Sequence, residues 1–311
     1  MSAETIRRRI PFSAIVGQED MKLALKLAYV QPGLSGVLLT GHRGTAKSTL
    51  VRAFAMAVYG QLPVTLPINA TEDRVVGGWK IDELAEHQQW KEQAGLLEKA
   101  NGEMLYIDEV NLLEDHIVDI ILDVAASGII EVQHEGQDKR RDARFTLVGT
   151  MNPEEGHLRP QLLDRFDLYV DVKTETELRS EILRRMLELD AAFQSIDRGE
   201  STPQTIKDFE SKDEELKKQL DEASKRHTKI DDTILDLCVK LAEGLNVTGH
   251  RGERVLALAA QGLAAIDGKD EVKKEHLRRV AQMALRHRHD SDKGQGDWGG
   301  TQDKLVEEIL G

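Results

Sequence analysis

The stretch GVLLTGHRGTAKST, residues 36–49, decides the fold of this chain. Its first part, GVLLT, is a short apolar run between glycines, which is typical of a buried strand. Its second part, GHRGTAKS at 41–48, is a glycine loop, and Lys47-Ser48 opens a helical pattern that ends at Gly60. Strand, glycine loop and helix in this order predict a P-loop, which binds phosphate groups.

The chemistry of a P-loop needs few groups. Backbone N–H groups of the loop and of the helix N-terminus point at anionic oxygens. Lys47 would place a positive charge on the β- and γ-phosphates of ATP, and Ser48 would offer its hydroxyl to Mg²⁺. The expected nucleotide-binding residues are therefore Gly41, His42, Arg43, Gly44, Thr45, Ala46, Lys47, Ser48 and Thr49.

One position departs from the strict P-loop pattern, because Ala46 stands where the second glycine is usual. We expect the cost to be small if Ala46 holds a negative φ. Taken alone, the imperfect match leaves an ordinary strand–helix turn as the alternative.

A second strand carries the next candidate residues. EMLYIDE at 103–109 is an apolar run ending in Asp108-Glu109, about 60 residues after Lys47. In P-loop ATPases such an Asp holds Mg²⁺, and a nearby residue orients the attacking water. Acids at the carboxyl end of a strand also lie where open α/β sheets bind ligands. We therefore assign Asp108 to the metal together with Ser48, and Glu109 to the water.

Two further side chains complete the candidate site. Asn152 follows the strand FTLVGT at 145–150, from which its amide could reach a γ-phosphate, although Asn-Pro is also a turn signal. Arg165 lies in HLRPQLLDRFDL at 157–168 and could act as an arginine finger across a subunit interface. The structural alternative for Arg165 is an ion pair with Asp164 at a helix end.

Alternating strand and helix patterns extend over the first half of the chain. Such alternation predicts a parallel sheet covered by helices, hence an α/β fold. Residues 128–136 and 139–149 read as the two arms of a hairpin with its turn at Gln137-Asp138. The expected strands are 36–40, 64–68, 103–108, 145–150 and 167–172, and the expected helices are 19–30, 47–59 and 114–127.

The composition changes after Val172, because residues 173–290 carry only helical patterns. We expect three parts: a nucleotide-binding αβα domain over 1–172 with a hairpin insertion at about 128–146, an all-helical domain over 173–290, and a flexible tail over 291–311. Within that tail, 291–300 is Gly/Asp-rich and typical of a flexible linker, and the last residues, TQDKLVEEILG, could form one short helix. The RHRHD segment at 286–290 holds two histidines, His287 and His289, which alone make an incomplete metal site. An exposed helix end is the interpretation we prefer.

Composition excludes several classes of protein. The 311 residues suit two domains, and the formal net charge of −13 argues against non-specific nucleic-acid binding. Cys238 is the single cysteine, which excludes an intramolecular disulfide and fits a reducing compartment. No apolar run is long enough for a transmembrane helix, and the N-terminus has no secretory pattern. We expect a cytoplasmic protein that binds neither membranes nor nucleic acids.

Several segments together carry a family resemblance. IVGQED, GHRGTAKST, NATEDRVVGG, the long run GLLEKANGEMLYIDEVNLLEDHIVDIILDVAASG, GTMNPEEGHLRPQLLDRFDL and GHRGE closely resemble the AAA+ ATPase subunit of magnesium chelatase, its small I subunit. The resemblance runs from about Phe12 to Arg288. It implies a P-loop AAA+ αβα sandwich followed by a helical lid, with ATP and Mg²⁺ as cofactors.

The same resemblance implies roles for single residues. Lys47 and Ser48 would be the Walker A residues, Asp108 and Glu109 the Walker B pair, and Asn152 sensor 1. Arg165 would be the arginine finger acting in trans. Arg251 in GHRGE would be sensor 2, with Arg254 the weaker candidate, and Val16 and Gly17 would flank the adenine. The segment near 71–97 would hold an insertion characteristic of the group.

The resemblance also implies an assembly. The chain would form a homo-oligomeric ring, a hexamer, which works with an AAA+/VWA D-type subunit and a large tetrapyrrole-binding subunit. ATP hydrolysis would drive metal insertion, either of magnesium into protoporphyrin IX or of cobalt into a corrinoid. The alternative is a MoxR-like remodelling chaperone that acts with a VWA-domain partner.

Overall fold

The centre of the molecule is a five-stranded sheet with the order β2-β5-β8-β1-β9, in a computed structural model that describes residues 9–79, 92–134, 137–289 and 298–311. Each neighbouring pair of strands is parallel, so the α/β fold expected from the sequence is confirmed. The strand β2 stops at Leu66, because Pro67 has no N–H to continue the ladder. The strands are β1 (Val37–Thr40), β2 (Val64–Leu66), β5 (Met104–Ile107), β8 (Thr146–Met151) and β9 (Leu168–Asp171).

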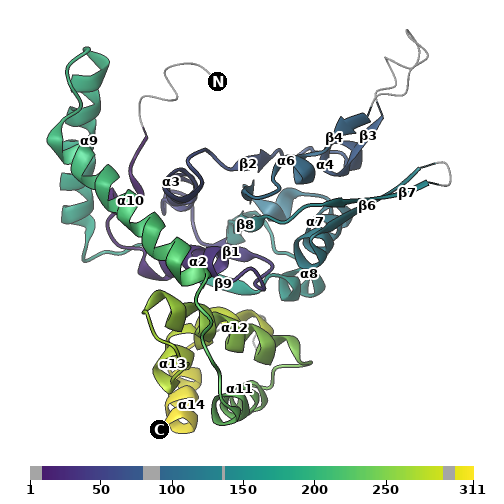
Figure 1. Cartoon of the computed structure of the whole chain (residues 1–311). Coiled ribbons are helices and arrows are strands. Elements are labelled where there is room, and N and C mark those ends of the chain that lie inside the picture. The colour runs from purple at the N-terminus through teal and green to yellow at the C-terminus, as the bar shows by residue number, and fades with distance from the viewer. Residues whose placement is uncertain (1–8, 80–91, 135–136, 290–297) are drawn as a thin grey trace.

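Helices cover both faces of this sheet (Figure 1). Alternate side chains of a strand point to opposite faces. Val37 and Leu39 therefore join a core with α2 (Glu19–Val30) and α3 (Lys47–Tyr59). Leu38 joins the opposite core with α7 (Asp115–Ser127) and α8 (Pro160–Arg165). The result is a three-layered αβα domain with its P-loop at the start of α3.

Two antiparallel hairpins leave this domain on the same side (Figure 1). One is formed by β3 (Gly77–Trp79) and β4 (Glu92–Ala94), between α4 (Glu72–Val76) and α6 (Leu96–Lys99). The other is formed by β6 (Ile129–His134) and β7 (Gln137–Asp142), close to the predicted bounds. His134 pairs with Gln137, so the turn predicted at Gln137-Asp138 is wrong: both residues belong to β7.

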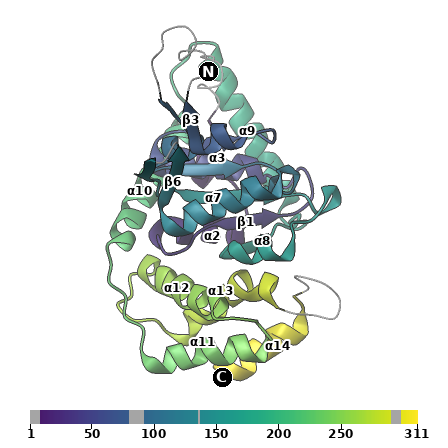
Figure 2. The ribbon, with the colours of Figure 1, turned by 90° about the vertical axis from the view of Figure 1, so that its right-hand side faces the viewer.

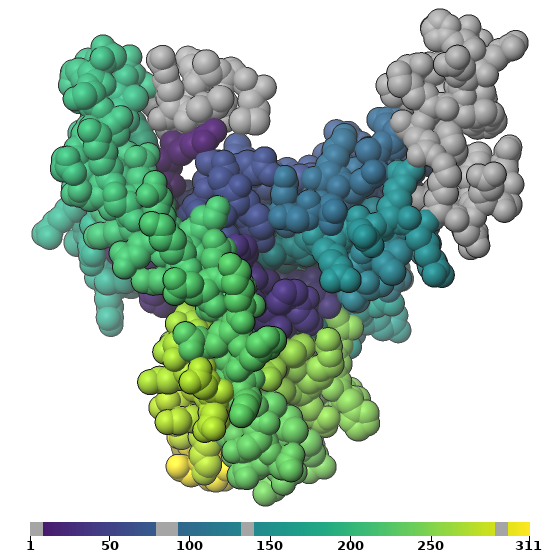
Figure 3. Space-filling model, in the orientation of Figure 1, coloured from purple at the N-terminus to yellow at the C-terminus, as the bar shows by residue number. Residues whose placement is uncertain are grey.

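The helices after β9 do not form one unit. The helix α9 (Arg179–Asp197) packs on α10 (Gln204–Ser224), and the two project beside the αβα domain (Figures 1 and 3). Along its length α10 contacts α2, α3 and the 3₁₀ helix η1 (Phe12–Ala14), and also α12. The region 173–290, predicted as one helical domain, is thus divided between an arm on the αβα domain and a separate bundle.

That bundle lies beneath the αβα domain (Figure 2). Its members contact one another and α12 also contacts α2. The short helix that the sequence allowed at the end of the expected tail is present as Gly300–Leu310, and Val306 and Leu310, one turn apart, are buried against the bundle. The members are α11 (Asp232–Gly244), α12 (Arg251–Ile266), α13 (Lys274–Leu285), the 3₁₀ helix η4 (Arg286–Arg288) and α14 (Gly300–Leu310).

No helix in the described part of the chain has the length and apolarity needed to cross a bilayer. Cys238, expected in the core, is buried on α11, and burial raises the pKa of its thiol to about 12.

Candidate functional site

A cavity of about 350 Å³ opens where β1, β5 and β8 end at their carboxyl termini. Parallel strands place their carboxyl ends at one edge of the sheet, which is where α/β folds bind ligands. The cavity brings the glycine loop together with residues that follow the other two strands. Its lining comprises Arg43, Gly44, Thr45, Ala46, Lys47, Ser48, Thr49, Asp108, Glu109, Thr150, Met151 and Asn152.

The glycine loop folds tightly around Lys47. Gly41 has a φ of 151°, and a Cβ atom there would lie 2.4 Å from the carbonyl oxygen of Val172, so only glycine fits. The ammonium group of Lys47 donates hydrogen bonds to the carbonyl oxygens of Gly41 (2.5 Å) and His42 (2.9 Å). Partial burial lowers the pKa of Lys47, while the carboxylates of Asp108 and Glu109 oppose that shift. The lysine is the first residue of α3.

Ala46 does not have the negative φ for which replacing the usual glycine would cost little free energy. Its φ is 64° and its ψ is 17°, in the left-handed region. An L-residue with a Cβ is disfavoured there by roughly 1–2 kcal/mol. The condition for a small cost is therefore not met, and the loop holds strain at the residue before Lys47.

Asp108 and Ser48 place two oxygen atoms that could bind a metal ion close together. Ser48 Oγ lies 3.4 Å from Asp108 Oδ1 across the cavity. Both also contact Tyr106, whose hydroxyl lies 2.9 Å from Ser48 Oγ and 2.8 Å from Asp108 Oδ1. Burial raises the pKa of Tyr106 to about 12, so it stays protonated and can donate. Hydroxyl and carboxylate oxygens are what Mg²⁺ takes from proteins beside a phosphate, so these residues fit that ion.

Glu109 is held by its backbone as well as its side chain. Its φ is 57°, and its N–H donates to Thr150 Oγ1 at 3.1 Å. The same hydroxyl donates to Asp108 Oδ1 at 2.7 Å, so Thr150 links the two acids. Arg43 Nη2 lies 3.6 Å from Glu109 Oε1 and also pairs with Glu155. Desolvation and the nearby Glu155 raise the pKa of Glu109, against the opposing charge of Arg43.

Asn152 lies at the end of β8, beside β1, as the sequence predicted. It is 4% exposed and lines the cavity. Its Oδ1 accepts from the N–H of Glu154 (3.3 Å) and caps the 3₁₀ helix η3 (Pro153–Glu155). Asn152 therefore both caps the turn after β8 and lines the cavity.

Sequence reasoning missed Tyr106, Thr150 and Glu155. Tyr106 precedes Asp108 by two positions, so strand periodicity places both on one face of β5. Thr150 is a polar residue near the carboxyl end of β8, after the apolar residues Leu147 and Val148. Both signals are visible in the sequence, whereas the approach of Glu155 to Arg43 depends on the turn after β8.

A second cavity, of about 230 Å³, lies at the same edge of the sheet, beyond β9. Gln18, Asp171 and Glu175 line it, together with Met283 of α13. The Gln18 N–H donates to Glu175 Oε1 at 2.7 Å, while Glu175 Oε2 is buried with no partner. Val16 and Gly17, expected near a bound adenine, immediately precede Gln18 but line neither cavity.

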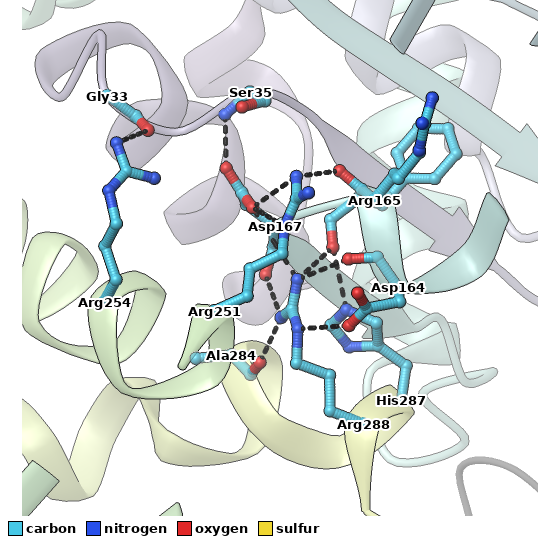
Figure 4. Close-up of polar contacts among 11 residues, drawn as sticks. Gly33, Ser35, Asp164, Arg165, Asp167, Arg251, Arg254, Ala284, His287 and Arg288 are labelled. Atoms are coloured by element: carbon cyan, nitrogen blue, oxygen red, sulfur yellow. Dashed lines mark hydrogen bonds and ion pairs between the residues drawn. The ribbon is translucent and has the colours of Figure 1, made fainter. Parts of the chain in front are cut away.

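The two arginines expected to act on phosphate lie elsewhere. Arg165, at the end of α8, pairs with Asp119 (3.0 Å) and Asp123 (2.9 Å) of α7. The alternative ion pair with Asp164 is absent, because Asp164 pairs with Arg288. Arg251, the first residue of α12, donates to the carbonyl oxygen of Arg165 at 2.6 Å (Figure 4). Neither arginine lines the P-loop cavity of its own chain.

Arg254, the weaker candidate for sensor 2, donates to the carbonyl oxygen of Gly33 at 3.4 Å (Figure 4). The exposed helix end predicted for RHRHD is wrong at its centre, since His287 is 3% exposed and Arg288 7%. Both are covered by the segment after α8, a contact that helix periodicity cannot reveal. Among the described residues no group of three His, Cys, Asp or Glu side chains is placed to hold a metal ion.

Comparison with known proteins agrees with this architecture. Residues 36–166 match the AAA domain family (dynein-related subfamily), and residues 235–309 match the AAA lid domain family. The magnesium-chelatase 38 kDa subunit of Rhodobacter capsulatus is 43% identical over 92% of this chain and 90% of its own length. That of Chlorobaculum parvum is 38% identical over 97% of both chains. The chain belongs to the family of magnesium-chelatase 38 kDa subunits.

One solved structure agrees at the level of the fold. A putative ATPase from Cytophaga hutchinsonii, 18% identical, matches 96% of this chain and 90% of its own with a TM-score of 0.65. A structure of the complex between subunits BchI and BchD of magnesium chelatase, based on cryo-EM, is 39% identical over 98% of this chain and all of its own, with a TM-score of 0.49. Family membership makes the chain an AAA+ ATPase that uses ATP and Mg²⁺.

Proposed function

We propose that this chain is the ring-forming motor subunit of a metal chelatase, which hydrolyses Mg-ATP to drive metal insertion by partner subunits. The observation that carries the proposal is the convergence of Lys47, Ser48, Asp108, Glu109 and Asn152 on one cavity in a chain of the chelatase family. Mg-ATP, when bound, supplies the phosphoanhydride bond whose hydrolysis does the work.

The chain's own residues have distinct parts in that reaction. Lys47 and the loop N–H groups neutralise the phosphate oxygens. Ser48 and Asp108 hold Mg²⁺, a role supported by the 3.4 Å between their oxygens. Glu109 orients the attacking water and accepts its proton, for which its raised pKa suits it. Asn152 turns its amide to the γ-phosphate at the end of β8.

We assign the remaining residues by their position. Val16 and Gly17 flank the adenine, which the cavity beside Gln18 can receive at the edge that also carries the P-loop. Arg165 and Arg251 share a surface away from their own P-loop cavity. That separation supports action on the site of a neighbouring subunit, with Arg165 as the finger and Arg251 as sensor 2. A closed ring, a hexamer, supplies such a neighbour to every subunit.

We further propose a cytoplasmic complex with a D-type AAA+/VWA subunit and a large tetrapyrrole-binding subunit. Its reaction is magnesium insertion into protoporphyrin IX, with cobalt insertion into a corrinoid as the second possibility. The names of the relatives favour a chelatase over a MoxR-like remodelling chaperone.

The first test uses Glu109→Gln, which keeps the shape of the side chain and removes the base. The variant should bind ATP and hydrolyse it very slowly, whereas Glu154→Gln should turn over like the wild type. Glu154 is the matched control because it is exposed and contacts His42 rather than the acids on β5. Turnover by Glu109→Gln at the wild-type rate would refute the assignment.

The same variant serves to identify the partners. Tagged Glu109→Gln protein with ATP would be incubated in extract from its own source, and retained proteins identified by mass spectrometry. Capture of a large tetrapyrrole-binding subunit with a VWA partner supports the chelatase. Capture of a VWA protein with unrelated clients, and no such large subunit, supports remodelling instead. Samples without ATP are the control.

A further inference from the structure

Three side chains of the helical bundle donate hydrogen bonds to the backbone of the segment that carries Arg165 (Figure 4). Arg251 Nη2 donates to the carbonyl oxygen of Arg165 at 2.6 Å. His287 Nε2 donates to that of Phe166 at 2.8 Å. Arg288 reaches the carbonyl oxygens of Asp164 (2.8 Å), Phe166 (2.7 Å) and Asp167 (3.1 Å). We call Arg251, His287 and Arg288 the clasp.

The clasp exists because α8 ends at Arg165. The last carbonyl groups of a helix have no partner within the helix, and cations near them are favoured by the helix dipole. Carboxylates add to the attraction: Arg288 Nε bonds to Asp164 Oδ1 at 3.0 Å, and Arg251 Nε to Asp167 Oδ1 at 3.2 Å. Asp167 is fully buried, and its other oxygen accepts from the N–H of Ser35 at 2.5 Å, just before β1.

Burial makes the clasp rigid. The guanidinium of Arg288 is almost fully covered, and His287 is buried with a pKa lowered well below its usual value, chiefly by desolvation. The bundle cannot shift against 164–167 without leaving buried carbonyl groups and the Asp167 carboxylate unpaired, which is costly. The clasp therefore fixes the backbone at the base of Arg165 against the bundle, while Asp167 also ties this segment to the residues before β1. The Arg165 guanidinium points the other way, to Asp119 and Asp123 on α7.

We propose that Arg288 is a positioning residue that couples the helical bundle of a subunit, which forms its lid, to the arginine finger. The same subunit donates that finger to its neighbour. The inference rests on the trans role of Arg165 under the proposed function. It adds that the lid sets where the base of the finger lies, through its contacts with the backbone of 164–167. A change in the position of the bundle in one subunit therefore changes the position of Arg165 at the ATP site of the next subunit.

The test is complementation in mixed rings of full-length chains, measured as phosphate release from ATP. Arg288→Met removes the donors while keeping the aliphatic stem. Arg278→Met is the matched control, because Arg278 pairs with Glu307 inside the bundle. Lys47→Ala subunits keep Arg165 but have an inactive P-loop site. Arg165→Ala subunits keep an active P-loop site but lack the finger. Arg288→Met rings alone should lose hydrolysis on the order of 10²-fold, the scale of a 1 Å misplacement.

The pattern of recovery identifies the role. Under the proposal, Arg288→Met mixed with Lys47→Ala regains hydrolysis, because an Arg288→Met pocket meets an intact finger. Mixed with Arg165→Ala it does not, because both subunits present a defective finger. The reverse pattern, or hydrolysis by Arg288→Met rings equal to that of Arg278→Met, overturns the coupling. A subunit that is only less stable recovers equally in both mixtures, which overturns it as well.

Two controls keep the outcomes apart. Lys47→Ala mixed with Arg165→Ala tests the trans arrangement itself, and failure of that mixture in proven mixed rings overturns the proposed function together with the coupling. If Arg288→Met does not fold, Asp164→Ala replaces it in both mixtures. Asp164 is half exposed, so its removal breaks the contact to Arg288 Nε without burying an unpaired charge. The same pattern of recovery is expected.

Discussion

Thr150→Val is the substitution that tests the site most directly. Valine has nearly the shape of threonine and lacks its hydroxyl. In the structure that hydroxyl donates to Asp108 Oδ1 (2.7 Å) and accepts from the Glu109 N–H (3.1 Å). The substitution therefore loosens both acids at once while leaving β8 and its neighbours packed.

The magnitude follows from the bonds lost. A hydrogen bond to a charged group contributes about 1.5–3 kcal/mol. If that support acts in the transition state, kcat falls about 10- to 150-fold. Because Asp108 is the proposed Mg²⁺ ligand, the Mg²⁺ concentration that supports half-maximal hydrolysis should also rise. The affinity for ATP should change little, since Lys47 and the loop N–H groups do not contact Thr150.

The assay is steady-state phosphate release over a series of Mg²⁺ concentrations, with ATP affinity measured separately. Thr146→Val is the control, because Thr146 begins the same strand and its hydroxyl bonds to Tyr59 at 2.7 Å, away from the acids. Thr150→Val hydrolysing ATP as fast as Thr146→Val would refute the reasoning that Thr150 organises the acids.

Three more outcomes are expected. Ala46→Gly should relieve the left-handed strain and stabilise the protein by about 1 kcal/mol in chemical unfolding, whereas Ala57→Gly within α3 should cost about that amount; destabilisation by Ala46→Gly would contradict the strain. Gly41→Ala should abolish ATP binding, since its Cβ would meet the Val172 carbonyl, whereas Gly300→Ala, outside the cavity lining and with open space around its Cβ, should bind ATP; equal binding by both would contradict the close approach. The lowered pKa of His287 means that the unfolded state takes up a proton first as the pH falls through about 6.5. From about pH 7.5 to 5.5 the wild type should lose more unfolding free energy than His287→Gln, by on the order of 1 kcal/mol, and equal losses would contradict a neutral buried His287.

Much of the αβα domain could be predicted because its signals are local. Each of these signals depends on a few neighbouring residues: the apolar run of Val37, Leu38 and Leu39, the glycine loop, and the acids after β5. Parallel pairing then places all three strand ends together, so the P-loop, Asp108 and Asn152 were expected to meet. The structure brings them to one cavity.

The errors lie where a tertiary contact decides. Helix periodicity recognised that 286–290 follows a helix, but the burial of His287 and Arg288 depends on a segment more than a hundred residues earlier. The residues after 300 indicated a short helix, but the docking of Val306 and Leu310 on the bundle depends on contacts with helices distant in sequence. The division of the helices between arm and lid likewise depends on contacts of α10 with α2, α3 and η1.

The positions of Arg165 and Arg251 show what a single chain can and cannot complete. The P-loop cavity of one subunit has one lysine and one arginine on its wall, and Arg43 is already paired with Glu155. The charge that develops on a transferred phosphoryl group calls for a further cation. Arg165 and Arg251 are joined through the Arg165 carbonyl on another surface, so a neighbour that receives one of them is brought close to the other. Under the proposed function, assembly is therefore a requirement of this site, and we expect a specific activity that depends on protein concentration.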